Sequence, residues 1–77
     1  MHAMTFDLDR DHVALNDLLK LSGVVDSGGA GKALVASGAV RVDGVVETRK
    51  TCKIRAGQRV RVGDIEIRVV GEAAPAA

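Results

Sequence analysis

The first half of the chain carries apolar side chains at helical spacing, in two stretches separated by a short linker. The first stretch predicts a helix of about 10–12 residues, capped by Asp9 or Asp11 because a carboxylate accepts hydrogen bonds from first-turn amides. Its apolar face consists of Val13, Leu15, Leu18 and Leu19, with Leu21 as a further candidate. Ser22-Gly23 ends this helix, since glycine readily adopts the left-handed conformation that follows a helix.

A second helix is predicted from Gly28 to about Ser37, with Ser27 as its N-cap and Gly38 as its stop. Gly28, Gly29 and Gly31 each weaken it by up to ~1 kcal/mol relative to Ala. Such a composition is expected where a helix packs closely against a neighbour, or where its N-terminus must approach a ligand.

From residue 39 onward the apolar positions alternate with a period of two, which is typical of strands. Asp43-Gly44 between two valine-rich runs predicts a hairpin with a type I′ turn. Residues 48–54 are polar and basic and are expected to be extended or irregular, and Ala56-Gly57 is a turn. Residues 58–62 and 65–70 flank Gly63-Asp64 and predict a second hairpin.

The second hairpin predicts specific cross-strand neighbours. A two-residue turn brings Arg61 opposite Glu66 and Arg59 opposite Arg68. The like-charged pair costs a few tenths of a kcal/mol, unless the side chains splay into water or an anion fills the space between them. The inward positions are Val60, Val62, Ile65, Ile67 and Val69.

These elements predict an α+β fold, with two packed helices followed by a small, mostly antiparallel sheet. Residues 1–8 are expected to form a loosely ordered lead-in, residues 9–70 the folded domain, and residues 71–77 a disordered tail.

Composition narrows the class of protein. The 77 residues form one domain at most, and the core must be aliphatic because Phe6 is the only aromatic side chain. Cys52 is the only cysteine, which excludes an internal disulfide and a multi-cysteine zinc site. The sequence shows neither a signal peptide nor an apolar run long enough to span a bilayer, so we expect a cytoplasmic protein.

The net charge of +1 conceals an uneven distribution. Residues 1–31 carry a net charge of −3, residues 32–70 carry +5, and the remaining residues carry −1. The bases of the second part are Lys32, Arg41, Arg49, Lys50, Lys53, Arg55, Arg59, Arg61 and Arg68. This asymmetry favours a polyanionic partner, although bases scattered over a solvated surface would produce the same count.

Three catalytic or metal-binding motifs are excluded. Residues 28–33 lack the first glycine and the final Ser or Thr of a phosphate-binding loop. Cys52 and His12 have no third residue to orient them as nucleophile and base, and the two histidines lack partners at metal-ligand spacing. We expect no enzyme activity, no cofactor and no metal.

The ordered set of elements resembles the S4 domain, also called the alpha-L RNA-binding motif. The resemblance covers about residues 12–70 and is closest to the small stand-alone members, which have a stretch similar to residues 47–54. It rests on Leu15, Leu18, Leu19, Gly23, Ser27, Leu34, Gly38, Val40, Val42, Asp43, Gly44, Gly57, Val60 and Val62.

The resemblance implies RNA binding by the second helix and the adjacent hairpin. Family members usually have Arg directly after the cap serine, where this chain has Gly28, whereas Lys32 matches a base that many of them share. Recognition is therefore expected to shift onto Lys32, Arg41, Arg49, Lys50, Lys53 and Arg55, with Gly28 and Gly29 letting the helix N-terminus approach a phosphate. Arg59, Arg61 and Arg68 extend this surface.

The implied ligand is structured or ribosomal RNA, because a chain with one aromatic residue has no platform for stacking bases. Two alternatives remain open. The bases could instead meet an acidic protein surface in a ribosome-associated or regulatory complex. The chain could also act only beside an RNA-modifying enzyme, as the motif often does as an accessory domain.

Overall fold

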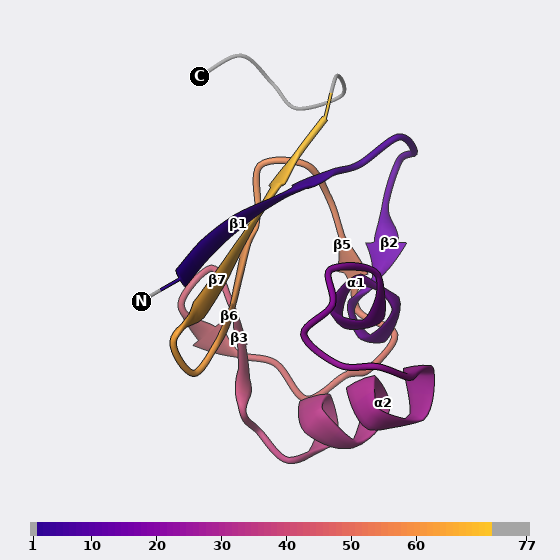
Figure 1. Ribbon diagram of the computed structural model, residues 1–77, viewed down its shortest axis with the longest axis vertical. Coiled ribbons are helices and arrows are strands. Elements are labelled where there is room, and N and C mark those ends of the chain that lie inside the picture. The colour runs from indigo at the N-terminus through magenta and orange to yellow at the C-terminus, as the bar shows by residue number, and fades with distance from the viewer. Residues whose placement is uncertain (1, 72–77) are drawn as a thin grey trace.

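The computed structural model describes residues 2–71 and has an α+β fold, as the sequence predicts (Figure 1). Two short helices lie together beside a sheet. The elements in chain order are β1 (His2–Asp7), β2 (Val13–Ala14), α1 (Leu15–Leu21), α2 (Gly28–Ala36), β3 (Val40–Val42), β4 (Val45–Val46), β5 (Lys53–Ile54), β6 (Arg59–Val62) and β7 (Ile65–Val70).

The main sheet has the strand order β1-β7-β6-β3-β4, and every pair is antiparallel except β1 with β7. Strands β2 and β5 form a separate two-stranded ladder. Both predicted hairpins are confirmed. Asp43 and Gly44 have φ values of 52° and 85°, as a type I′ turn requires, and Arg59 pairs with Arg68 as the two-residue turn predicts.

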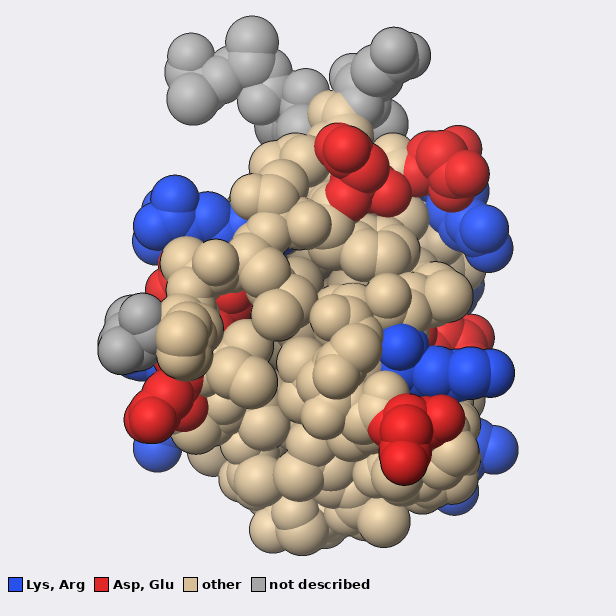
Figure 2. All heavy atoms as spheres, viewed as in Figure 1, with Lys and Arg blue, Asp and Glu red and all other residues tan. Residues whose placement is uncertain are grey.

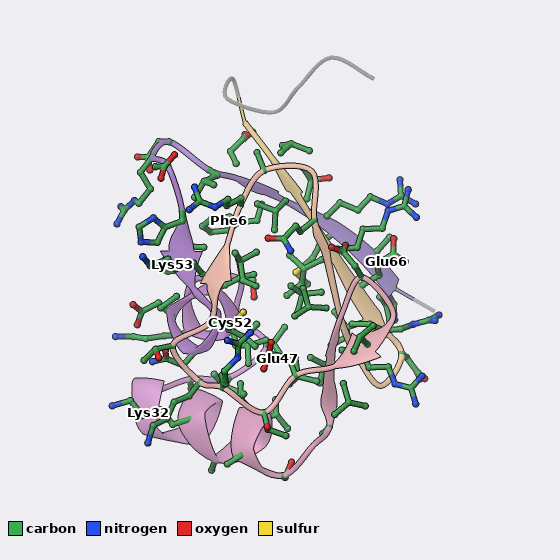
Figure 3. The ribbon with its side chains drawn as sticks, turned by 180° about the vertical axis from the view of Figure 1, so that it is seen from behind. Phe6, Lys32, Glu47, Cys52, Lys53 and Glu66 are labelled. Atoms are coloured by element: carbon green, nitrogen blue, oxygen red, sulfur yellow. The ribbon has the colours of Figure 1, made fainter. Side chains whose placement is uncertain are left out.

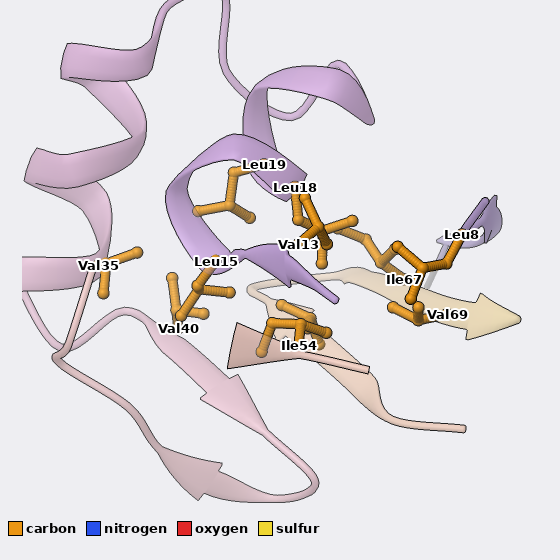
Figure 4. Close-up of a cluster of buried hydrophobic side chains, with 11 residues drawn as sticks. Leu8, Val13, Leu15, Leu18, Leu19, Val35, Val40, Ile54, Ile67 and Val69 are labelled. Atoms are coloured by element: carbon orange, nitrogen blue, oxygen red, sulfur yellow. The ribbon is translucent and has the colours of Figure 1, made fainter. Parts of the chain in front are cut away.

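The core lies between α1, the inner face of the sheet and β5 (Figure 4). Leu15, Leu18 and Leu19 of α1 are fully buried, as is Ile54 of β5. The remaining core side chains are Leu8, Val13, Val35, Val40, Val60, Ile67 and Val69. The core is entirely aliphatic, as the composition predicts, and Phe6 packs at its margin.

The prediction of a loosely ordered lead-in over residues 1–8 is wrong for the described part of that segment. Residues 2–7 form β1, which pairs in parallel with β7 along its whole length. Met4 and Phe6 pack against the core. Strand β1 pairs with β7, which lies some sixty residues later in the sequence. No hairpin turn joins the two strands, so the sequence carries no local turn signal that would identify residues 2–7 as a strand. The predicted tail lies outside the described residues from position 72 onward.

The first helix is shorter than predicted, at seven residues, and neither Asp9 nor Asp11 caps it. Ala14 occupies the N-cap position with extended backbone and no capping side chain. The amides of Leu15 and Asn16 instead donate to the carbonyl oxygens of Cys52 and Lys50, at 2.9 and 3.0 Å. The polypeptide of a distant loop therefore replaces the predicted carboxylate cap.

The second helix begins and ends where the sequence predicts. The Ser27 hydroxyl accepts from the Ala30 amide at 3.1 Å, and Gly38 follows the helix with a φ of 82°. Helix α2 packs against α1 through Gly31, where a Cβ atom would lie 2.8 Å from the backbone oxygen of Asn16. This contact accounts for one of the three glycines, because only a residue without a side chain fits there.

We expect opposite effects from two alanine substitutions in α2. At Gly29 a Cβ meets nothing within 4 Å, so Gly29→Ala should raise the free energy of unfolding by up to about 1 kcal/mol through helix propensity. Gly31→Ala should lower it by about 1 kcal/mol, because the backbone overlap outweighs the same gain in propensity. Urea unfolding followed by circular dichroism measures both, and equal stabilisation by the two substitutions would contradict the close contact.

Candidate nucleic-acid interface

The basic loop of residues 49–53 lies against the first turn of α1. The hydrogen bonds from Leu15 and Asn16 to the loop carbonyls hold its backbone, and the β2–β5 ladder continues the attachment at Lys53. The same Asn16 meets α2 at Gly31, the neighbour of Lys32. The loop, the start of α1 and the first turn of α2 therefore meet at one junction.

Three lysines surround this junction, and we call them the lysine surface: Lys32, Lys50 and Lys53. All three are exposed, and within residues 2–71 none of them forms an ion pair with a carboxylate. Lys32 and Lys53 lie on the same side of the molecule in Figure 3. No close acid among the described residues balances their positive charges, and their grouping into one RNA-contact surface stays a prediction.

The lysine surface borders space that a ligand can enter. A hollow of about 370 Å³ is lined by Arg49, Thr51, Cys52 and Lys53. At the start of α2, the Gly28 and Gly29 amides have no hydrogen-bond partner among the described residues. A Cβ atom added at either glycine would meet nothing within 4 Å. An anion therefore has unoccupied donors and cations within reach on this side.

Glu47 holds the loop and was not identified from the sequence. Its carboxylate accepts hydrogen bonds from the Arg49 amide, Nε and Nη2 at 3.0, 3.2 and 3.1 Å, although its side chain is only 18% exposed. These bonds lower the pKa of Glu47 to about 2. The sequence signals are a glutamate two residues before an arginine and its place at the start of residues 47–54, the stretch that resembles the small family members. Because of this pairing, the charge of Arg49 is largely balanced within the loop.

Arg55 is likewise paired. Its guanidinium donates to the Asp11 carboxylate at 2.9 Å, and this contact lowers the pKa of Asp11. Asp11, predicted as a helix cap, is therefore an ion-pair partner instead. Of the six bases predicted for RNA contact, Arg49 and Arg55 each have a carboxylate neighbour that balances their positive charge.

The remaining predicted bases lie elsewhere, so the expectation of one continuous basic surface is wrong. Arg41 pairs in register with Arg61, which pairs with Glu66, and all three side chains leave the outer face of the sheet. Glu66 and the two labelled lysines lie on opposite sides of the molecule in Figure 3. We call the outer set the arginine surface: Arg41, Arg59, Arg61 and Arg68. On the face shown in Figure 2, the basic side chains lie towards the two edges, and most of the surface between them is uncharged.

Cys52, which the sequence analysis considered as a nucleophile, is a free thiol of intermediate burial. Burial and the neighbouring Glu47 carboxylate raise the pKa of the Cys52 thiol, which keeps it protonated and weakly nucleophilic. In residues 2–71 there is no group of three or more His, Cys, Asp or Glu side chains that could hold a metal ion. Neither helix is long and apolar enough to cross a membrane in that part of the chain.

Known proteins match this arrangement closely. The solution structure of YbcJ from Escherichia coli superimposes with a TM-score of 0.68 at 52% identity, covering 86% of this chain and 85% of that one. That structure is described as revealing an alpha-L motif involved in RNA-binding. The YbcJ sequences of Escherichia coli K12 and Shigella flexneri are each 52% identical over 67 residues, which span 86% of this chain and 96% of theirs.

The family model for the S4 domain matches residues 6–70, which include every helix and all of the sheet except the first residues of β1. The order of elements, the two hairpins and the packed helix pair agree with this match, and the resemblance inferred from the sequence is confirmed. The chain belongs to the S4 domain family.

Proposed function

We propose that this protein binds structured RNA through the lysine surface and acts by binding, without catalysis. One observation carries the proposal: the basic loop is tied by backbone hydrogen bonds to the α1–α2 junction, which gathers Lys32, Lys50 and Lys53 around it. Because the backbone of the loop is already fixed in the free protein, RNA binding does not have to order it. Less conformational entropy of the loop is therefore lost on binding.

The chemistry of this surface suits a sugar-phosphate backbone. Lysine and arginine side chains displace condensed counterions from RNA, and this release dominates the affinity of most nucleic-acid-binding proteins. The unpartnered amides of Gly28 and Gly29 add donors at the positive end of the α2 dipole. Lys32 lies one turn further along the same helix, so one phosphate could engage both the amides and the ammonium group.

The family relationship supports RNA as the polyanion. The related YbcJ is described as having a motif involved in RNA-binding, and this chain shares half of its residues. Phe6, the only aromatic side chain, packs against the core and offers no surface for stacking bases. Phosphates and 2′-hydroxyls of folded or double-stranded RNA, including ribosomal RNA, are therefore the expected contacts. We assign this activity to the cytoplasm, where a lone thiol such as Cys52 stays reduced.

Removal of two lysine charges should weaken binding in a salt-dependent way. For a short RNA hairpin titrated at several salt concentrations, Lys32→Gln/Lys50→Gln should reduce the slope of log affinity against log salt by about 1.5. The matched control is Arg10→Gln/Lys20→Gln, which removes the same charge from exposed side chains outside this surface. An equal loss in both double variants, or no detectable binding by the wild type at low salt, would refute the proposal.

The Glu47–Arg49 contact predicts an unusual titration. Because the folded-state pKa of Glu47 lies near 2, below its ordinary value, the contact stabilises the loop at neutral pH and weakens as the pH falls towards 2. Arg49→Gln should shift the Glu47 carboxyl midpoint upwards, as measured from its carbon chemical shift by NMR. Arg68→Gln is the matched control, since it should raise the pKa of Glu66 and leave that of Glu47 unchanged. A wild-type midpoint at the ordinary value would show that the contact does not form in solution.

A further inference from the structure

Three hydrogen bonds join Glu47 to Arg49 and fix the direction of the guanidinium group. The carboxylate accepts from the Arg49 amide, Nε and Nη2, so the edge of the guanidinium group that carries Nε faces Glu47. The other N–H donors, including both on Nη1, are directed away from the carboxylate. Because the Arg49 side chain is 76% exposed, these donors are open to a ligand from solvent.

The backbone on either side of this pair is fixed as well. The Glu47 amide donates to the carbonyl oxygen of Val40 in β3 at 2.9 Å, and the Arg49 carbonyl accepts from the Cys52 amide at 3.1 Å. The Cys52 carbonyl in turn accepts from Leu15 at the start of α1. The Glu47 side chain is 18% exposed and lies close to Cys52 (Figure 3). The carboxylate therefore holds Arg49 from a fixed position between β3 and α1.

The arginine that Glu47 orients lines a hollow together with other hydrogen-bond donors. The hollow of about 370 Å³ is bounded by Arg49, Thr51, Cys52 and Lys53. The Thr51 hydroxyl and the Lys53 ammonium group can each donate to a phosphate oxygen. A planar guanidinium group adds a directional contact with phosphate, and it loses little side-chain freedom on binding if its direction is already set. The hollow thus combines the donors that a phosphate group needs.

We propose that Glu47 is a positioning residue for RNA binding, because it holds Arg49 in the direction from which it donates to a backbone phosphate in this hollow. The inference rests on the proposed function and adds Arg49 and its carboxylate partner to the residues that bind RNA. An acidic side chain beside a surface that binds a polyanion ordinarily repels the ligand, so its neutralisation should tighten binding. Neutralisation of Glu47 should instead weaken binding, since Arg49 then loses its fixed direction.

Titration of a short RNA hairpin at several salt concentrations tests this role. Glu47→Gln keeps the shape of the side chain and removes its charge. It should lower the affinity by a factor of about five and reduce the slope of log affinity against log salt by about 0.8, the equivalent of one phosphate contact. Arg49→Gln should cause the same changes, and Glu47→Gln/Arg49→Gln should bind no more weakly than Arg49→Gln, because Glu47 acts only through Arg49.

A further variant makes the test independent of whether Glu47→Gln folds. Arg49→Lys keeps the positive charge but cannot donate to Glu47 from two nitrogen atoms, so it should also bind the hairpin less tightly than the wild type. Circular dichroism measures whether each variant is folded. Wild-type affinity in a folded Arg49→Lys variant would overturn the inference.

Glu66→Gln is the matched control, because Glu66 is 17% exposed and accepts at 2.9 Å from Arg68 of the arginine surface, two residues further on. Its affinity should stay within about twofold of wild type, with an unchanged salt slope. Equal losses in Glu47→Gln and Glu66→Gln, or binding by Glu47→Gln at least as tight as wild type, would overturn the inference. If Lys32→Gln/Lys50→Gln weakens binding and Glu47→Gln does not, the proposed function stands and this inference fails. A wild type that binds no hairpin refutes the proposed function itself.

Discussion

Two backbone hydrogen bonds at the start of α1 organise the rest of the structure. The first amides of a helix have no partner within it and need acceptors from elsewhere. Here the acceptors are the carbonyls of Lys50 and Cys52, which belong to the most basic loop of the chain. The same two hydrogen bonds therefore cap the helix and hold the backbone of the loop that carries the cationic side chains. Asn16 links both to α2, because its own carbonyl leaves room only for Gly31.

The pleat of the sheet explains why the protein has two charged surfaces rather than one. Alternation along β6 and β7 sends Val60, Ile67 and Val69 into the core and their arginine neighbours outward. The inner face is covered by α1 and β5, and the residues of the lysine surface belong to α2, the basic loop and β5. Glu66 of the outer face accordingly lies on the opposite side of the molecule from Lys32 and Lys53 (Figure 3).

Neighbouring carboxylates balance the positive charge of some basic side chains and not of others. Glu47, Asp11 and Glu66 each pair with one arginine. Exposed ion pairs of this kind contribute little to stability, but they reduce the local positive potential and fix the direction of a long side chain. The lysines have no such partner among the described residues. Arginines thus shape the loop and the sheet face, and lysines supply most of the uncompensated charge beside α2.

The sequence by itself determined the elements whose signals are local. Ser27 and Gly38 bound α2, and Asp43-Gly44 and Gly63-Asp64 set the register of both hairpins, because each depends on residues a few positions apart. The S4 fold could be inferred from these elements in order. Only the tertiary structure decided the strand pairing of residues 2–7, the true start of α1 and the division of the bases. These three features depend on contacts between residues that are far apart in the sequence, such as the hydrogen bond from Leu15 to Cys52. A local sequence pattern does not show which distant residues come into contact.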